Sequence, residues 1–268
     1  MTMRNGAMPV TMALLMALSS NAAWVHAAQG PQVTQSPVDT PERILFVGNS
    51  YFYYNDSLHN HVRRLAIAGD PANEKSLRYK SATIGGAPLA HHNIEHLLAP
   101  GQLGMKRPFE LVILQGNSTA ALSDARRASF REKVSELNAE IVKRGASTVL
   151  YMTHAHVKPS RFASPDMIRK IEDMYVSVGN EVGAFVIPVG LAFEEAYRQR
   201  PDIKLHKDYD GSHPDLLGTY LAACVVYASL YGKSPVGNSY DYYGKVDKES
   251  AAFLQKIADE TVRKFYGR

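Results

Sequence analysis

The stretch that decides the fold reads Arg43-Ile44-Leu45-Phe46-Val47-Gly48-Asn49-Ser50-Tyr51. Its first half is a short apolar run rich in β-branched and aromatic residues, typical of a buried strand, and it stops abruptly at Gly48. Asp56-Ser57-Leu58 follows as a good helix start, so the segment predicts a strand, a tight turn and a helix. A buried parallel strand delivers the residues after it to the carboxyl edge of the sheet, where α/β proteins place their chemistry. Ser50 is therefore a candidate nucleophile.

A histidine near the other end of the chain can supply the base that such a serine needs. A hydroxyl is a poor nucleophile near neutral pH until a base takes its proton, and that base is usually oriented by a carboxylate. The segment Asp210-Gly211-Ser212-His213-Pro214 offers both groups. A spacing of three residues across a turn lets Asp210 reach one imidazole nitrogen of His213 and leaves the other for Ser50. A helix predicted over 216–230 begins just beyond and would fix the histidine's backbone.

Strand-like apolar runs recur along the chain at regular spacing. They cover residues 43–48, 78–84, 109–115, 147–153 and 184–189. Successive runs start 31 to 38 residues apart, the length of a strand, a crossover helix and two loops. Stretches with a helical apolar period lie between and after them, over 58–67, 130–142, 165–182 and 248–265. The pattern predicts an α/β domain in three layers, with helices on both faces of a five-stranded parallel sheet.

The first 27 residues have the features of a secretory signal peptide. Arg4 is their only charge, residues 12–18 are apolar, and Val25 and Ala27 are small residues of the kind that signal peptidases prefer. The apolar run is too short to span a bilayer, so stable membrane insertion is not expected. Cleavage near Ala27 would leave a periplasmic or secreted protein. Residues 28–42 are predicted to be a flexible leader, and residues 43–268 one folded domain.

Composition argues against some classes of function. The net charge is only +4, and no block of Lys and Arg stands out among the 268 residues. Because binding along a phosphate backbone requires clustered cations, nucleic acid is not an expected partner. Cys224 is the only cysteine, so no intrachain disulfide can form, and its apolar neighbours indicate a buried position.

Polar motifs follow four of the predicted strands at the points where they end. They are Ser50, Gly85-Gly86, Gly116-Asn117-Ser118 and Thr153-His154-Ala155-His156, in chain order. Because the carboxyl ends of parallel strands meet at one edge, these motifs are expected around one site. A glycine lets a backbone N–H approach closely, and an asparagine amide donates without carrying charge. Gly86 and Asn117 can therefore form an oxyanion hole, with the Ser50 amide as a third donor.

In this order the motifs resemble those of the SGNH/GDSL hydrolase superfamily of esterases and lipases. The likeness rests on a Ser in a Gly-x-Ser turn after the first strand, then a Gly, then an Asn, then Asp-x-x-His-Pro before the penultimate helix. It spans essentially the whole mature chain and implies a flavodoxin-like α/β/α sandwich, so that 43–268 would be an SGNH-type hydrolase domain. It also implies Ser50 as nucleophile, Gly86 and Asn117 as oxyanion donors, and His213 as base, oriented by Asp210.

The sequence departs from the family pattern in each of the first three blocks. Asn49 stands where the name-giving motif has Asp, and Tyr51 where it has Leu. Gln115 stands where the third block usually has Gly, which makes its amide an alternative oxyanion donor to the asparagine. The second block offers both Gly85 and Gly86, and Gly86 is preferred because it lies one residue further from the strand. These differences indicate a divergent branch.

Tyr51, Gln115 and His154 are the residues expected to line the substrate site. Tyr51 opens an aromatic run that can stack on a sugar, pack an acyl chain or fill the core. His154 and His156 form a His-x-His pair of a kind that can bind a metal. No third ligand is evident, so a role at the edge of the cleft is favoured and no metal is expected.

The sequence thus predicts an exported serine esterase that needs no cofactor and acts on a small-molecule or glycan ester. Short-chain acyl or carbohydrate acetyl esters are favoured over long-chain lipids because no extended apolar lid is evident. Two alternatives remain open: a periplasmic O-acyltransferase with the same residues, and a carbohydrate-binding protein that has lost activity. The sequence does not indicate the oligomeric state.

Overall fold

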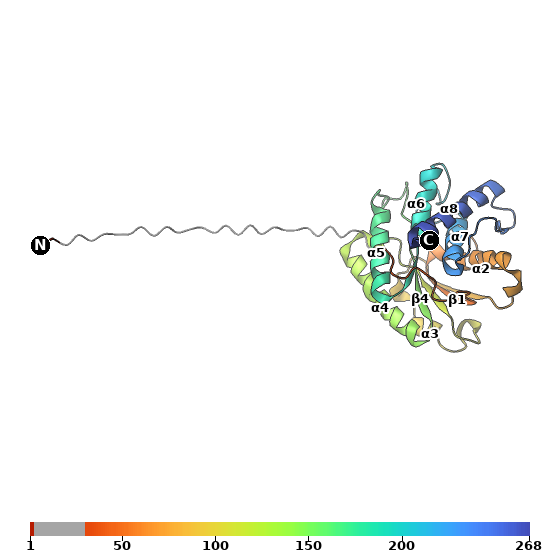
Figure 1. Cartoon of the computed structure of the whole chain (residues 1–268), viewed down its shortest axis with the longest axis horizontal. Helices are drawn as coiled ribbons and strands as arrows, with labels where there is room; N and C mark the ends of the chain where they lie inside the picture. The colour runs from red at the N-terminus through yellow and green to blue at the C-terminus, as the bar shows by residue number, and fades with distance from the viewer. Residues whose placement is uncertain (3–29) are drawn as a thin grey trace.

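A five-stranded parallel sheet lies at the centre of the domain (Figure 1). The computed structural model describes residues 1–2 and 30–268, so the predicted signal peptide lies outside the described residues except for its first two. The strands are β1 (Arg43–Gly48), β2 (Arg78–Thr83), β3 (Leu111–Leu114), β4 (Ser147–Tyr151) and β5 (Phe185–Ile187). Their order is β2-β1-β3-β4-β5, and every neighbouring pair is parallel. This is the flavodoxin-like strand order, so the predicted doubly wound sandwich is confirmed.

Helices cover both faces of the sheet (Figure 1). On one face lie α2 (Leu58–Gly69), α6 (Val189–Gln199), α7 (Leu216–Tyr231) and α8 (Lys248–Tyr266). On the other lie α3 (Ile94–Leu97), α4 (Asp124–Lys143) and α5 (Met167–Val182). Successive strand residues point to opposite faces, so Ile44 and Phe46 of β1 join the first apolar core while Leu45 and Val47 join the second.

Helix α7 is apolar on all sides because it is enclosed by other helices. It packs against α2, α6 and α8, and every residue from Gly218 to Leu230 is buried. Cys224 lies in this stretch with no exposed area, as predicted. A helix that is hydrophobic all round belongs either in a protein core or in a membrane. Across residues 1–2 and 30–268, no helix combines the length and the apolar character that crossing a membrane requires.

Helix α6 was not predicted, and the predicted strand over 184–189 was too long. The strand β5 ends at Ile187, Pro188 follows, and α6 begins at Val189. The apolar run of the strand passes directly into the helix, whose Val189, Ala192 and Phe193 are fully buried or nearly so. With no polar loop and no capping side chain between the two elements, the boundary leaves no signal in the sequence.

The register of the sheet aligns the carboxyl ends of three strands. Val47 of β1 pairs with Leu114 of β3, and Gly48 pairs with Thr83 of β2. The ladder then runs one residue further, since the Gln115 amide donates to the Val47 carbonyl at 2.9 Å. The segments after β1, β2 and β3 therefore leave the sheet side by side, at the point between β1 and β3 where the strand order reverses.

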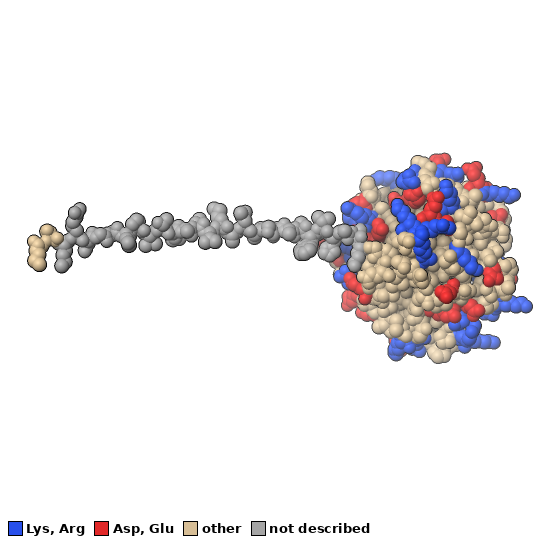
Figure 2. All heavy atoms as spheres, viewed as in Figure 1, with Lys and Arg blue, Asp and Glu red and all other residues tan. Residues whose placement is uncertain are grey.

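Charged side chains of both signs are spread over the surface. Figure 2 shows Lys and Arg interspersed with Asp and Glu on the face in view. Many of them form ion pairs one helical turn apart, such as Arg198 with Glu195 and Lys256 with Glu260. Such exposed pairs contribute little to stability. Their mixture is typical of a solvated surface.

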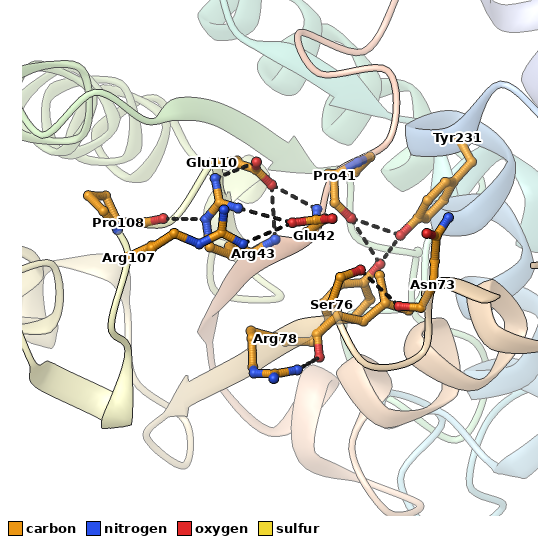
Figure 3. Close-up of polar contacts among 12 residues, drawn as sticks. Pro41, Glu42, Arg43, Asn73, Ser76, Arg78, Arg107, Pro108, Glu110 and Tyr231 are labelled. Atoms are coloured by element: carbon orange, nitrogen blue, oxygen red, sulfur yellow. Dashed lines mark hydrogen bonds and ion pairs between the residues drawn. The ribbon is translucent and has the colours of Figure 1, made fainter. Parts of the chain in front are cut away.

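Residues 30–42, the described part of the predicted leader, contain no helix or strand and lie against the domain. Val33 and Val38 are partly buried against the apolar core. At its end the segment is held by hydrogen bonds at the amino edge of the sheet, where the Tyr231 hydroxyl donates to the Pro41 carbonyl at 2.9 Å (Figure 3). Glu110 accepts from the Glu42 amide at 2.7 Å in the same cluster. These contacts fix where the chain enters β1.

Candidate active site

Ser50 lies directly beyond β1, at the first position of the short helix α1 (Ser50–Tyr53). The turn before it is tight because a Cβ on Gly48 would come within 2.5 Å of Gln115 Oε1. Asn49 caps the helix, since its Oδ1 accepts from the Tyr51 amide at 3.2 Å. Only 6% of the Ser50 surface is exposed. The serine is thus held on rigid backbone at the carboxyl edge of the sheet.

Asp210 and His213 form a closed turn. One oxygen of the carboxylate, Oδ1, accepts from the backbone amides of Ser212 at 2.8 Å and His213 at 3.0 Å. The other, Oδ2, lies 2.5 Å from Nδ1 of the His213 imidazole. Burial raises the pKa of Asp210, but these three hydrogen bonds outweigh burial, and the net effect is a lowered pKa. The carboxylate is therefore ionised at neutral pH and can only accept.

The imidazole of His213 joins this carboxylate to Ser50. Because Asp210 can only accept, Nδ1 of His213 carries the proton and Nε2 keeps its lone pair. Nε2 lies 2.8 Å from Ser50 Oγ, across 163 residues of sequence. The two segments predicted to meet are therefore in hydrogen-bond contact. The chain Ser50–His213–Asp210 has the geometry of a nucleophile, a base and an orienting acid.

Gly86 and Asn117 contact each other, and the Gly86 segment is joined to the turn that carries Ser50. Asn117 Nδ2 donates to the Gly86 carbonyl at 3.1 Å, and Asn49 Nδ2 donates to the carbonyl of the next residue, Ala87, at 3.1 Å. Gly86 has a φ of +67°, a conformation that favours glycine. Gly85 lies outside that region of φ, although a Cβ there would lie 3.2 Å from the Tyr53 hydroxyl. Gly86 and Asn117 are thus in contact with each other, and the residue after Gly86 is bound by Asn49, the neighbour of Ser50.

Gln115 has a different place from the one expected. Its side chain has no exposed area. Oε1 accepts from the Asn49 amide at 2.9 Å, and Nε2 donates to the Gly116 carbonyl. Because both ends of the amide are engaged beneath the turn, Gln115 neither lines the substrate site nor stands free as an alternative oxyanion donor. It fixes the β1 turn instead.

Tyr51 and His154 are also buried and do not line the surface. Tyr51 is 4% exposed and His154 has no exposed area. Their rings stack at 4.4 Å between centroids, and Phe193 stacks on the other face of His154 at 4.3 Å. Burial lowers the pKa of His154 well below its ordinary value, so the imidazole is neutral. Both rings therefore lie in the buried layer beneath the site.

The pair His154 and His156 does not assemble a metal site in the part of the chain that the structure describes. No group of three or more His, Cys, Asp or Glu side chains in residues 1–2 and 30–268 could hold a metal ion. His154 Nε2 lies 2.8 Å from the Ser212 carbonyl oxygen, and His156 Nδ1 lies 2.7 Å from Ser160 Oγ. Both imidazoles are engaged in hydrogen bonds within the protein.

Tyr54 belongs to the aromatic run that follows Ser50, but the sequence did not single it out from that run as a residue of the site. Its ring stacks on the imidazole of His213, with 4.4 Å between centroids and 16° between planes. Its hydroxyl lies 3.1 Å from the hydroxyl of Tyr209, and this contact, together with burial, raises the pKa of Tyr54 to about 12. Tyr54 lies four residues after Ser50, one helical turn away. That spacing was the signal available in the sequence.

A large cavity elsewhere in the domain contains none of these residues. It lies among α4, α5, α6 and α8 and is lined by side chains such as Arg131, Glu194 and Lys264. The residues that line it include Ser177 but no histidine. The candidate active site is therefore the one at the edge of the sheet, at Ser50.

Comparisons with known proteins identify the fold. No protein-family model matches the chain, and no curated protein matches it. Solved structures do match. A DUF4886 family protein from Bacteroides uniformis has a TM-score of 0.61 at 19% identity, over 82% of this chain and 93% of its own. A candidate SGNH hydrolase from Slackia heliotrinireducens has a TM-score of 0.55 at 21% identity, over 71% and 99%.

An esterase is among the structural neighbours. The acetyl xylan esterase AlAXEase has a TM-score of 0.55 at 12% identity, over 70% of this chain and 98% of its own. Lipolytic proteins of the GDSL type share the same architecture. At these identities the likeness establishes a shared fold. The chain has the three-layer fold of SGNH/GDSL hydrolases and esterases, as the resemblance in sequence implied.

Proposed function

We propose that this protein is a serine esterase that hydrolyses carboxylic esters with short acyl groups, carbohydrate acetyl esters included. The observation that carries the proposal is the continuous chain from Ser50 Oγ to His213 Nε2, at 2.8 Å, and from His213 Nδ1 to Asp210 Oδ2, at 2.5 Å. The shared fold with SGNH-type hydrolases and an esterase supports it.

The three side chains have distinct roles in this mechanism. Ser50 Oγ attacks the ester carbonyl carbon while His213 Nε2 takes the hydroxyl proton. The imidazolium then gives that proton to the leaving alcohol, and an acyl-enzyme remains. A water molecule, deprotonated by the same nitrogen, releases the carboxylic acid and restores Ser50. Asp210 holds Nδ1 protonated throughout and stabilises the imidazolium.

The oxyanion is assigned to donors on three segments. They are the Ser50 amide at the start of α1, the Gly86 amide and the second hydrogen of Asn117 Nδ2, whose first hydrogen binds the Gly86 carbonyl. An oxyanion donor is typically worth about 3 kcal/mol of transition-state stabilisation. Because the asparagine is itself held by the segment that carries Gly86, the two donors stay at a fixed separation.

The side chains around His213 support a preference for esters with short acyl groups and for acetyl esters of carbohydrates. Two exposed tyrosines lie close to the residues that contact the imidazole: Tyr53 is 43% exposed and Tyr209 is 67% exposed. Tyr53 stacks on Tyr54, which stacks on His213. Aromatic faces with hydroxyl edges suit a sugar ring better than a long alkyl chain.

A series of p-nitrophenyl esters from acetyl to palmitoyl tests the proposal. We expect the highest kcat/KM with short acyl groups, and a loss of about 10³-fold or more in Ser50→Ala and in His213→Ala, the scale seen when a triad member is removed. The control is Ser76→Ala, whose hydroxyl donates to the Asn73 carbonyl in the connection between α2 and β2. Activity that survives in His213→Ala would contradict the assignment of the base.

Two further outcomes separate the alternatives. A fluorophosphonate probe that labels the wild type but not Ser50→Ala supports an enzyme, whereas no labelling supports an inactive binding protein. A Ser50-dependent product with the acyl group moved to a glycan hydroxyl, in place of free acid, would identify an acyltransferase.

We also propose that the protein is exported, on the strength of its first 27 residues. A single charge at Arg4, an apolar run over 12–18 and small residues at Val25 and Ala27 fit a cleaved signal. N-terminal sequencing of the protein recovered from a secreting bacterial host should begin near Ala28. An intact N-terminus in the cytoplasmic fraction would refute export.

A further inference from the structure

Ser212, between Asp210 and His213, makes hydrogen bonds with its own loop and with two other segments of the chain. Its amide donates to Asp210 Oδ1 at 2.8 Å. Its carbonyl accepts from His154 Nε2 at 2.8 Å. Its hydroxyl lies 2.8 Å from the hydroxyl of Tyr51 and 3.2 Å from His156 Nε2. The backbone and the side chain of this one residue are thus both tied to other segments.

The segment after β4 forms a cradle for this loop. Four consecutive residues, 154–157, each contact the segment 206–212: His154 and His156 bind Ser212, the Ala155 carbonyl lies 3.0 Å from His206 Nε2, and the Val157 amide donates to the Gly211 carbonyl at 2.8 Å. The approach is so close that a Cβ on Gly211 would lie 2.1 Å from the Val157 carbonyl oxygen. These contacts fix the position of the segment 206–212 against the segment after β4.

Tyr51 extends this arrangement to the nucleophile. It is the neighbour of Ser50 in sequence, and its hydroxyl lies 3.2 Å from His156 Nε2 as well as 2.8 Å from Ser212 Oγ. Its ring is fixed by stacking on His154 at 4.4 Å, and its edge meets the ring of His213 at 5.8 Å. A buried hydroxyl in such a network costs free energy if its partner is removed.

The hydrogen atoms of this network can all be placed without conflict. The carbonyl of Ser212 can only accept, so His154 carries its proton on Nε2. The Tyr51 hydroxyl, Ser212 Oγ and His156 Nε2 all lie within hydrogen-bond distance of one another. One consistent arrangement has Tyr51 donating to Ser212 Oγ, Ser212 donating to His156 Nε2, and His156 Nδ1 donating to Ser160 Oγ. Burial lowers the pKa of His156 to about 4, which keeps this imidazole neutral at working pH.

We propose that Ser212 and Tyr51 are positioning residues, whose mutual hydrogen bond sets the distance between the nucleophile segment and the base segment. The bond joins the residue after Ser50 to the residue before His213. It therefore helps to fix the 2.8 Å distance between Ser50 Oγ and His213 Nε2, on which proton transfer depends. Neither hydroxyl touches the reacting atoms. The inference rests on the proposed esterase function and adds to it the part of the protein that aligns the site.

The test compares Tyr51→Phe, Ser212→Ala and the double variant with the wild type. Each substitution removes one hydroxyl and keeps the rest of the side chain. We expect each single variant to lower kcat for p-nitrophenyl acetate and the rate of fluorophosphonate labelling by about 10-fold, with KM changed less than about 2-fold. The double variant should lose no more than either single variant, because both break the same bond. Ser212→Thr, which keeps a hydroxyl, should retain activity.

Tyr266→Phe is the matched control for a merely structural effect. It removes another buried tyrosine hydroxyl, which donates to the Val186 carbonyl at 2.7 Å. We expect Tyr51→Phe and Tyr266→Phe to lower thermal stability alike, but only Tyr51→Phe to lower the labelling rate. Equal labelling rates in Tyr51→Phe, Ser212→Ala and the wild type, or losses that add in the double variant, would overturn the inference.

A readout independent of catalysis separates this inference from the proposed function. The proton on His213 Nδ1, shared with Asp210, can be followed by NMR through its downfield resonance. Loosening of the loop should speed its exchange with water in Tyr51→Phe and Ser212→Ala relative to wild type and Tyr266→Phe. A wild type that no probe labels would refute the esterase proposal, while an unchanged resonance in both variants would refute the positioning role.

Discussion

Asn49 occupies the position beside the proposed nucleophile where the GDSL motif has aspartate. Its amide makes two hydrogen bonds of opposite polarity: Nδ2 donates to the Ala87 carbonyl at 3.1 Å, and Oδ1 accepts from the Tyr51 amide at 3.2 Å. The side chain is only 3% exposed. An ionised aspartate can accept but not donate, so it would set a buried charge against the Ala87 carbonyl oxygen. The amide is therefore the residue that this turn requires.

Asn49→Asp should destabilise the protein by about 1–3 kcal/mol at pH 7, the cost of a buried donor lost to a carbonyl. Burial raises the pKa of the new carboxyl. The cost is then largest above that pKa and shrinks as the pH falls, because the protonated acid can donate again. Urea unfolding at pH 7.5 and pH 5.5, each relative to wild type at the same pH, measures both effects.

Asn93→Asp is the matched control for this substitution. Asn93 is exposed and caps α3, with its Oδ1 accepting from the His96 amide at 3.0 Å. An aspartate keeps that bond and suits a helix N-terminus, so stability should not fall. An Asn49→Asp protein as stable as wild type at pH 7.5 would show that the contact with Ala87 contributes nothing.

The residues that the sequence predicted at the carboxyl edge of the sheet do follow the strand ends there, but the sequence did not indicate which of their side chains are buried. Ser50, Gly86 and Asn117 follow strand ends, and strand ends can be found from apolar runs. Gln115 and His154 follow strand ends equally well and are fully buried. Whether a side chain at a strand end turns outward or inward depends on what packs above it. Here the packing comes from α1 and the 206–213 segment, which are distant in sequence.

At the scale of elements, the connection between α1 and α2 stores backbone strain beside the site. Asn55, Asp56 and Ser57 have φ values of 53°, 65° and 69°, a region that side chains rarely adopt. The conformation persists because Asn55 Nδ2 donates to the Pro214 carbonyl at 3.0 Å and to Thr219 Oγ1 at 2.8 Å. The strained connection thus ties the end of α1 to the start of α7, on either side of the proposed triad.

Ser57→Gly should stabilise the protein. Ser57 combines a φ of 69° with a ψ of 124° and makes no side-chain cap for α2. Strain of this kind costs about 1–3 kcal/mol, which exceeds the roughly 0.5–1 kcal/mol of extra chain entropy that glycine brings to the unfolded state. We expect a gain of about 1 kcal/mol, seen as a rise of about 2–4 °C in Tm by calorimetry.

Ser76→Gly provides the comparison, since Ser76 has no positive φ and its hydroxyl donates to the Asn73 carbonyl at 2.8 Å. It should lower Tm, because glycine there adds chain entropy without relieving strain. A fall in Tm in Ser57→Gly as large as in Ser76→Gly would show that the hydrogen bond from Ser57 Oγ to His59, at 2.9 Å, matters more than the strain.

Element boundaries show the same limit on reading a sequence. Strand β1 was predicted with its observed bounds because Gly48 ends an apolar run. Helix α6 was missed because its buried face, with Val189, Ala192 and Phe193, continues the apolar run of β5. Periodicity separates helix from strand only where polar residues mark the exposed side. Between two layers of a sandwich, too few such residues remain.

At the scale of the whole molecule, burial of neutral histidines couples the fold to pH. Burial lowers the pKa of six histidines in the described chain: His59, His61, His92, His154, His156 and His206. For His206 the pKa falls from 6.5 to about 4. Between those values the unfolded chain binds a proton that the folded protein excludes. The stability from such a group is complete above pH 6.5 and is lost progressively as the pH falls toward 4.

The free energy of unfolding should therefore fall by several kcal/mol between pH 7 and pH 5, of which His206 alone accounts for about 2 kcal/mol. Its Nε2 lies 3.0 Å from the Ala155 carbonyl oxygen and its Nδ1 lies 2.7 Å from the Tyr197 hydroxyl, so the neutral imidazole, with its proton on Nε2, already has both nitrogens hydrogen-bonded while burial disfavours the charged form. Urea unfolding at both pH values should show His206→Asn less stable than wild type at pH 7. Between pH 7 and pH 5, however, its free energy of unfolding should fall by about 2 kcal/mol less than that of wild type. His96→Asn, at an exposed site, should follow wild type. An equal fall in the free energy of unfolding in all three proteins would mean that the burial of His206 does not cause the loss of stability at low pH.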